Sequence, residues 1–398
     1  MSHLIKKGSL LRFHGGITKL ALVSFIVAVA AAFIDTIWII FVKQFIHNDA
    51  YIGFFSGILT CISLVSLFLI IPIIERGHKE RLYMFALCMV IVSYIVFSFV
   101  KSFYVFIIFS VVLTLAANLR ISSFGILVRD NSKKKVLAKN EGIVYTFFNT
   151  GWFIGPLLAG FLALRFGNRG VFLIASLFVF MALILFWQFG IKDGNVKKKA
   201  DTNVLKNFFD FFKNRKRVVA YFLGGGISCW WVLIYLFVPL FIYDKGYNIL
   251  WVSGFLFAVV LPNILFTYPA ASLANRIGFK KIFFIGFLIL GTSAFLCFLS
   301  NDFYFILGAL ILAGFGTAMV ESTCESYFFD ISKGNEPYRF YSAYNTTIDV
   351  GHLIAKFIPS LALLFFPFKF VFLIFSIFMF SYMILSLFTE RIVEGKKR

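Results

Sequence analysis

Long apolar stretches alternate with short polar segments along the whole chain. Twelve of these stretches contain roughly 20 residues, the length that a helix needs to cross the hydrocarbon core of a bilayer. The pattern therefore predicts twelve membrane-spanning helices, near residues 20–42, 52–74, 82–100, 103–128, 142–164, 171–190, 218–242, 249–272, 282–299, 303–328, 340–362 and 370–388.

One pattern occurs twice, with a constant offset of 200 residues. The Val-Phe-Leu-Ile run at 171–174 recurs at 371–374, and a glycine two residues after Asn or Asp stands at both Gly151 and Gly351. An internal repeat of this size indicates a duplicated unit. Six spans in each repeat return the chain to its starting side, so both repeats insert in the same orientation, as parallel repeats do. We expect an all-α integral membrane fold of 12 transmembrane helices in two six-helix repeats.

The longest polar segment separates the two repeats and marks the domain boundary. It predicts an N-terminal repeat at 1–190, a basic cytoplasmic linker at 191–217 and a C-terminal repeat at 218–398. Residues Val204 to Arg217 place aromatic side chains and cations as an amphipathic helix does, which predicts a position on the inner membrane surface against anionic lipid. For the first part of the linker, a solvated connection is the alternative.

Composition also assigns the chain to a membrane. The hydrophobic fraction is 61%, charged residues are 14% and the mean hydropathy is +0.92, whereas soluble domains are about half apolar and about a quarter charged. The five cysteines all fall inside apolar spans and share no metal-ligand spacing. We therefore interpret them as small buried side chains and expect neither a disulfide nor a bound metal.

The formal net charge of +20 predicts sidedness rather than nucleic-acid binding. Of the 38 Lys and Arg residues, 30 lie in segments on the side of the N-terminus and six on the other side. Cytoplasmic segments carry such an excess, so both termini are predicted to be cytoplasmic. Compact loops and the lack of a targeting signal favour the plasma membrane of a prokaryote, with the protein as a multi-pass component.

Two loop motifs and one span motif carry a resemblance to a known family. The segment Asn275-Arg276-Ile277-Gly278, followed by cations, lies between spans eight and nine, and a degenerate copy with Glu75 and Arg76 lies between spans two and three. Together with the plan of two times six spans, these turns resemble the major facilitator superfamily over nearly the whole chain. In that family the turn carries charge interactions that hold one transport state, which implies the same role here.

Span five contains Gly151, Gly155 and Pro156 at a spacing that is similar to the motif of proton-coupled drug antiporters in that family. Small residues four apart let helix backbones approach closely, and proline removes a backbone donor and allows a bend. The motif therefore favours a bendable contact, suited to a gate between the halves. Ordinary close packing without any antiport role is the alternative.

Charges inside membrane spans are costly and mark transport pathways or proton relays. The residues predicted to couple protons or to gate are Asp35, Arg120, Glu321, Asp349, His352 and Lys356. Counted from the cytoplasmic ends of their spans, Arg120, Glu321 and Asp349 lie at a similar depth, whereas Asp35 and Lys356 lie nearer the outside.

We therefore hypothesise that Arg120 pairs with Glu321 or Asp349 and favours the outward-facing state. A proton from outside would neutralise the acid, weaken the pair and favour inward opening. A permanent ion pair that only fixes helix packing is the alternative.

Other polar and aromatic side chains are predicted to line a substrate cavity. They are Trp38, Asn149, Trp152, Trp230, Tyr235, Asn263 and Glu325. Aromatic faces bind apolar or cationic organic molecules. Since the chain is 20% aromatic, packing against lipid or other helices is the competing interpretation for these rings.

The sequence thus predicts a secondary transporter that exports small amphipathic organic compounds in exchange for protons. A proton-coupled importer of a nutrient is the first alternative, and a non-transporting receptor or scaffold is the second. No catalytic constellation or P-loop occurs, so we expect no enzyme activity, no cofactor and the proton gradient as the energy source. The expected partners are a small-molecule substrate and the lipid bilayer, with no nucleic acid, and the protein is expected to be a monomer.

Overall fold

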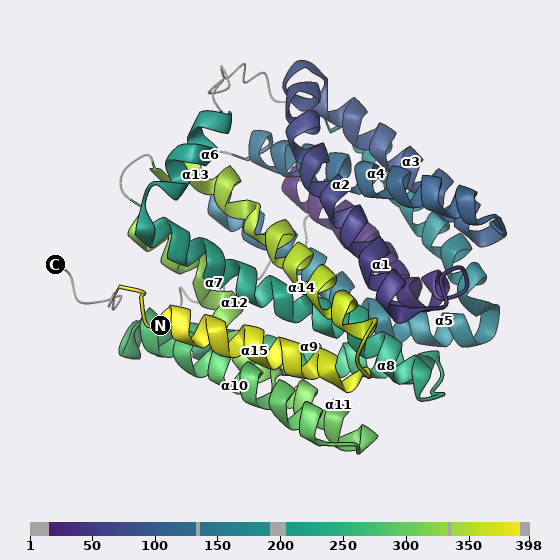
Figure 1. Ribbon diagram of the computed structural model, residues 1–398. Helices are drawn as coiled ribbons and strands as arrows, with labels where there is room; N and C mark the ends of the chain where they lie inside the picture. The colour runs from purple at the N-terminus through teal and green to yellow at the C-terminus, as the bar shows by residue number, and fades with distance from the viewer. Residues whose placement is uncertain (1–15, 133–135, 192–203, 333–335, 391–398) are drawn as a thin grey trace, which may run out of the picture. The chain divides into compact units, whose positions relative to one another are not determined.

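The computed structural model describes residues 16–132, 136–191, 204–332 and 336–390, and in these ranges the backbone forms helices and turns without a β-strand (Figure 1). The first helices are α1 (Gly16–Val42), α2 (Asp49–Arg76), α3 (Lys79–Phe99), α4 (Phe103–Asp130), α5 (Leu137–Gln188) and α6 (Val204–Phe212). The later ones are α7 (Arg215–Val232), η2 (Leu233–Phe237), α8 (Val238–Asp244), α9 (Ile249–Ile277), α10 (Phe279–Leu299), α11 (Phe303–Leu312), α12 (Gly314–Ile331), α13 (Glu336–Asn345), α14 (Thr347–Leu363) and α15 (Lys369–Ser386).

The twelve predicted spans are present as helical segments. Among the described residues, ten helical stretches are long and apolar enough to cross a membrane. One of them, α5, contains two spans, because Gly167 interrupts it with φ 70° and ψ 169°. The eleventh span is divided into α13 and α14, which are 10 and 17 residues long. The all-helical membrane fold predicted from hydropathy is therefore confirmed.

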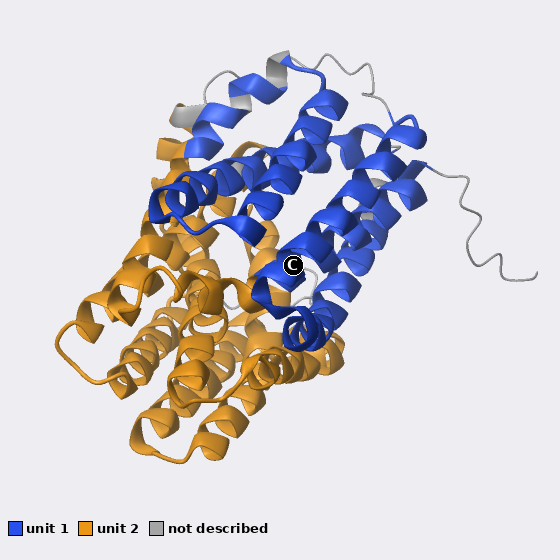
Figure 2. Cartoon of the chain, turned by 90° about the vertical axis from the view of Figure 1, so that its right-hand side faces the viewer, with its two compact units in different colours: residues 1–34, 66–198 blue, residues 35–65, 199–398 orange. Residues whose placement is uncertain are grey.

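The chain divides into two compact units that are not the two halves of the sequence repeat (Figure 2). The first unit contains residues 1–34 and 66–198, and the second contains residues 35–65 and 199–398. The contact boundary thus falls inside α1 and α2, whose outer parts belong to the second unit. Inner and outer follow the sidedness that the cation distribution predicts.

In the first unit, α3 packs against α4 and α5. Small residues set the distance between α5 and α1. A Cβ at Gly151 would lie 2.8 Å from the Cβ of Ala28, and one at Gly155 would lie 2.4 Å from the Cβ of Ala32. These contacts are too short for any side chain, so the glycines permit the two backbones to approach. Pro156 follows inside the same continuous helix.

In the second unit, α14 packs against α7, α12 against α9 and α10 against α15. Gly351 takes the same role as its repeat counterpart Gly151. A Cβ at Gly351 would lie only 2.5 Å from the carbonyl oxygen of Gly225 on α7. Each repeat therefore joins its fifth span to its first span through glycine, and the sequence repeat has a matching packing contact.

The linker helix is shorter than the amphipathic stretch predicted for Val204 to Arg217. Helix α6 ends at Phe212, and α7 begins at Arg215, so Arg217 belongs to the seventh span. The reason is a new helix start, because the Asn214 side chain accepts a hydrogen bond of 2.9 Å from the backbone N–H of Lys216. Asparagine is a favoured N-cap residue.

The close contact of Gly351 gives a stability prediction. Gly351→Ala places a methyl group against a backbone carbonyl that cannot move aside, which costs about 1–3 kcal/mol by overpacking. Gly308→Ala is the matched control, because a Cβ there has no neighbour within 4 Å. Alanine in a helix interior is favoured over glycine by about 1 kcal/mol. Thermal denaturation in detergent, followed by size-exclusion chromatography, should show a lower Tm for Gly351→Ala only. An equal Tm for both variants would contradict this packing.

Candidate functional site

The second unit holds a carboxylate inside its tenth span. Glu321 lies on α12, and its Oε2 accepts a hydrogen bond of 2.7 Å from Asn263 Nδ2 on α9. The Thr267 hydroxyl, one turn further along α9, donates to Asn263 Oδ1 at 3.1 Å. Because this bond occupies the amide oxygen, the amide nitrogen of Asn263 is directed at the carboxylate.

Two aromatic side chains of the seventh span lie beside this carboxylate. Trp231 forms a hydrogen bond to Glu321, and its ring centroid is 5.6 Å from that of Tyr235. Tyr235 belongs to the π-helical turn η2, and π-turns are frequent at functional sites because they redirect a side chain. Both rings are half-buried, whereas the predicted cavity residue Trp230 is fully buried.

Glu321 is exposed and is held by neutral donors. Among the described residues of the second unit, no Lys, Arg or His forms an ion pair with it. An ionised carboxylate in a membrane span is costly without a compensating charge. The arrangement therefore suits a site where a proton or a cationic group from outside the protein supplies that charge.

A second group of ionisable side chains lies around Lys356 on α14. Lys356 Nζ donates to Thr60 Oγ1 on α2 at 2.8 Å. It also interacts electrostatically with Asp349 on the same helix and with Asp35 on α1. Since one cation faces two carboxylates, a change in the protonation of either carboxylate changes the charge balance around Lys356.

The neighbours of this group complete a polar path. The Ser63 hydroxyl donates to Asp349 Oδ1 at 3.3 Å, and His352 lies in the electrostatic field of Lys356. Tyr235 interacts electrostatically with both Asp35 and Glu321. The charge of Asp35 therefore acts both on Tyr235 beside Glu321 and on Lys356.

Glu325 lies one helical turn nearer the inner end than Glu321. Its Oε1 accepts a hydrogen bond of 2.5 Å from the Tyr341 hydroxyl on α13. The Tyr341 ring stacks on Phe329 at a centroid distance of 5.7 Å. An exposed acid beside stacked rings is suited to contact an organic molecule that enters from the inside.

A charged cluster joins the outer ends of three helices of the second unit. Lys43, directly after α1, binds Asp49 at the start of α2 at 2.9 Å and also binds Asp244 at the end of α8. Burial would lower the pKa of Lys43, but its hydrogen bonds to Asp244 and Asp49 outweigh this effect and raise its pKa above the ordinary value. A cavity of about 460 Å³ beside the cluster is also lined by His47 and Phe366.

The structure also describes the neighbours of the predicted residues on spans one, four and five. Arg120 lies in the first unit near the buried Tyr83, and Asn149 is exposed on α5. Trp152 packs against Phe148 at a centroid distance of 6.1 Å. Trp38 contacts Phe41 at 6.3 Å. The hypothesised pair of Arg120 with Glu321 or Asp349 joins different units and stays a prediction.

The loop motif between α9 and α10 is described in part. Arg276 is exposed, and Gly278 has φ 85°, a backbone conformation that glycine adopts without steric cost. The side chains of Glu75, Arg76 and Asn275 lie outside the described residues. Within the described ranges, no three His, Cys, Asp or Glu side chains gather as a metal site would require.

Sequence reasoning missed several partners of the predicted residues. Thr60 and Ser63 on α2 and Thr267 on α9 each hold a charged or amide side chain in place. Their signal in the sequence is weak, because hydroxyl residues also occur in spans as partners of their own helix backbone. The Lys43 cluster had no signal at all, because its charges lie in short outer segments that only the fold brings together.

Comparisons with known proteins agree on one fold. A family model described as Major Facilitator Superfamily matches residues 20–262 and 252–398. A search of curated protein sequences found no match. Two solved structures of the nucleoside transporter NupG are similar, one of them a mutant form with TM-score 0.77 and 11% identity and the other with TM-score 0.75 and 13% identity. Each alignment covers 93% of this chain and 98% of NupG, which shows the fold.

The Lys43 cluster gives a prediction about stability and pH. Lys43→Met leaves Asp49 and Asp244 facing each other without a cation, so Tm in detergent should fall, and adding Asp244→Asn should restore part of it. Because the folded-state pKa of Lys43 is raised above the unfolded value of about 10.4, its stabilisation is complete below that value and is lost only as the pH rises through the folded-state pKa.

The Tm difference between the wild type and Lys43→Met should therefore be constant from about pH 7 to about pH 9. Lys101→Met, which removes an exposed outer lysine, is the control and should leave Tm unchanged. A difference that disappears across this pH range would contradict the assignment.

Proposed function

Since the chain belongs to the major facilitator superfamily, we propose that it is a secondary active transporter that couples proton movement to the export of small amphipathic organic compounds. Transport by this family proceeds by alternating access, and the chain is a multi-pass membrane protein of that fold. The proton gradient supplies the energy in this proposal, and the protein works without a cofactor.

One observation carries the proposal, namely the carboxylate of Glu321 that is held by the neutral donors Asn263 and Trp231. Neutral donors keep the carboxylate in position but do not cancel its charge. A proton and a cationic or donor-bearing substrate therefore compete for the same group. Competition at one site produces exchange when the empty protein does not change conformation, because each conformational change then carries either the proton or the substrate.

The Lys356 group supplies the link to the membrane potential. A proton that reaches Asp35 or Asp349 removes one of the two carboxylates that face Lys356. The potential contributes about 2.3 kcal/mol per proton per 100 mV. That amount is comparable to the free-energy difference of a few kcal/mol between two populated conformations, so proton entry is sufficient to bias the direction of transport.

The side chains around Glu321 favour an organic substrate with an aromatic or apolar body. Trp231 and Tyr235 present neighbouring rings, and rings of this kind bind apolar or cationic groups. Asn263 and Glu321 then bind the polar end of the molecule. An inorganic ion would leave the ring faces without a partner.

Import by proton symport is the second candidate, and one observation favours it. The similar structures are those of a protein named as a nucleoside transporter. A heterocycle with polar edges also offers a ring face to Trp231 or Tyr235 and polar atoms to Asn263 and Glu321. The direction of proton movement upon substrate addition separates the two candidates.

Everted membrane vesicles test the proposal directly. Vesicles that contain the protein are acidified by respiration, lumenal pH is followed with a dye, and lipophilic cations, nucleosides, sugars and amino acids are added in turn. We expect proton release from the lumen on adding an amphipathic compound, and loss of at least about 90% of that signal in Glu321→Gln, because removal of a titrating group abolishes coupling.

Glu141→Gln is the matched control, because Glu141 is an exposed acid near the start of α5. It should couple as the wild type does. Lumenal acidification that is unaffected by every compound, with folded protein present in the vesicles, would contradict antiport. Unchanged coupling in Glu321→Gln would exclude this residue as the shared site.

A further inference from the structure

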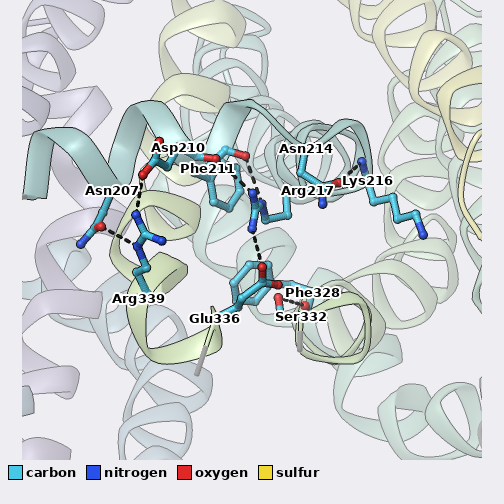
Figure 3. A network of polar contacts seen from close by, with 10 residues as sticks. All are labelled: Asn207, Asp210, Phe211, Asn214, Lys216, Arg217, Phe328, Ser332, Glu336 and Arg339. Carbon is cyan, nitrogen blue, oxygen red and sulfur yellow. Dashed lines mark hydrogen bonds and ion pairs between the residues drawn. The ribbon is translucent and has the colours of Figure 1, made fainter. Parts of the chain in front are cut away.

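The inner end of the second unit contains a dense network that the transport site does not use (Figure 3). At its centre is Arg217, in the first turn of α7, with only 7% of its surface exposed. Its guanidinium donates to the carbonyl oxygens of Phe211 at 3.1 Å and Asp210 at 3.0 Å, both on α6. It also donates to Glu336 Oε1 on α13 at 3.1 Å and lies 4.1 Å above the Phe340 ring. A buried arginine thus joins three helices.

A second arginine connects α6 directly to α13. Arg339 Nε donates to Asn207 Oδ1 at 2.7 Å, and its other end binds the carboxylate of Asp210. A hydrogen bond from Lys213, followed by the charge of Arg339, holds the pKa of Asp210 below its usual range. The carboxylate therefore stays ionised at neutral pH, and the contact persists there.

These contacts fix the inner half of a divided span. Helix α13 ends at Asn345 and α14 begins at Thr347, so only Thr346 lies between them. Besides that junction, α13 is attached through the α6 network, through the hydrogen bond of Tyr341 to Glu325, and through Tyr344, whose ring stacks on Phe328 of α12 at a centroid distance of 4.3 Å. Figure 1 shows α6 and α13 side by side, as their packing also indicates.

The network also reaches the junction between α13 and α14. Phe211 and Phe212 of α6 pack on the Tyr221 ring at 5.8 and 5.0 Å. The Tyr221 hydroxyl is hydrogen-bonded to Thr346 Oγ1 at 2.9 Å, and Tyr221 interacts electrostatically with Asp349. A chain of direct contacts therefore connects α6 to Thr346 at the junction, and the charge of Asp349, three residues further on, acts on Tyr221.

We propose that helix α6 is a strap that holds α13 at the inner end of the second unit and must release or move with it during transport. The effect of the strap on transport rests on the proposed transport function. The strap itself is defined only by contacts within the second unit. Arg217 attaches α6 to the unit at a buried position. The Arg339–Asp210 pair is more exposed, and this contact can break and reform because exposed pairs are weak and exchange readily.

The first test compares hydrogen exchange of the α13 backbone amides in three purified proteins. Arg339→Gln removes both side-chain contacts to α6 at an exposed position, so the protein should fold. Lys281→Gln is the control, since it removes an exposed cation of α10 at the same end of the unit. We expect α13 amides to exchange about two- to fivefold faster in Arg339→Gln, with α10 and α15 unchanged and Lys281→Gln equal to wild type.

Exchanging the two charges tests whether the Arg339–Asp210 pair slows the exchange of the α13 amides, rather than a local effect of substituting Arg339. Asp210→Arg combined with Arg339→Asp exchanges the two charges and should restore most of the slow exchange that either single variant loses. Transport in vesicles is then measured for the same proteins. We expect the turnover rate to change in Arg339→Gln and to return towards wild type in the reversed pair, with Lys281→Gln unchanged.

The outcomes separate the strap from the transport proposal. Unchanged exchange of α13 in Arg339→Gln, or no rescue by the reversed pair, would overturn the strap. Faster exchange with an unchanged turnover rate would show that α6 holds α13 without any part in transport and would also overturn the inference. If the wild type transports no compound although the exchange results hold, the transport proposal fails and the strap contact remains.

Discussion

An ionised carboxylate within a bilayer needs a compensating group, and the described neighbours of Glu321 within the second unit supply hydrogen bonds but no charge. The rest of the second unit can be understood from this constraint. The amide of Asn263 is fixed by Thr267, Trp231 lies two residues before a π-helical segment, and Tyr235 in that segment interacts electrostatically with Glu321 and Asp35. Each contact orients the carboxylate while leaving its charge to be met by a proton or a substrate.

Close backbone contacts hold together the helices that bear these charged residues. Gly351 lets α14 approach α7, and Gly53 and Gly57 let the outer half of α2 approach Ser360 and Phe357 on α14. The Lys356–Thr60 bond lies on the same face of the α2–α14 contact. Charge and packing therefore act on the same helix, since Gly351, Lys356 and Ser360 all belong to α14.

Much of the fold could be predicted from the sequence. Hydropathy alone locates the membrane-spanning segments, and the 200-residue repeat relates Gly151 to Gly351. Both glycines have the same packing role in the structure. The acids within the spans were also visible as charges in apolar stretches. Their partners were not, because pairs such as Ser63 with Asp349 or Arg217 with Glu336 depend on the rotation of helices that lie far apart in the sequence. The contact boundary inside α1 and α2 likewise has no counterpart in the hydrophobic pattern.

The central claim is that a proton and the substrate share Glu321, and proton release on binding tests it most directly. Purified protein in weakly buffered detergent solution is mixed with the transported compound, and the released protons are measured with a pH indicator while calorimetry measures binding. The account predicts about half a proton released per bound molecule when the pH equals the pKa of the site, close to one at lower pH, and none in Glu321→Gln. Binding of the compound to the wild type without proton release over about pH 5 to about pH 8, or unchanged release in Glu321→Gln, would contradict it.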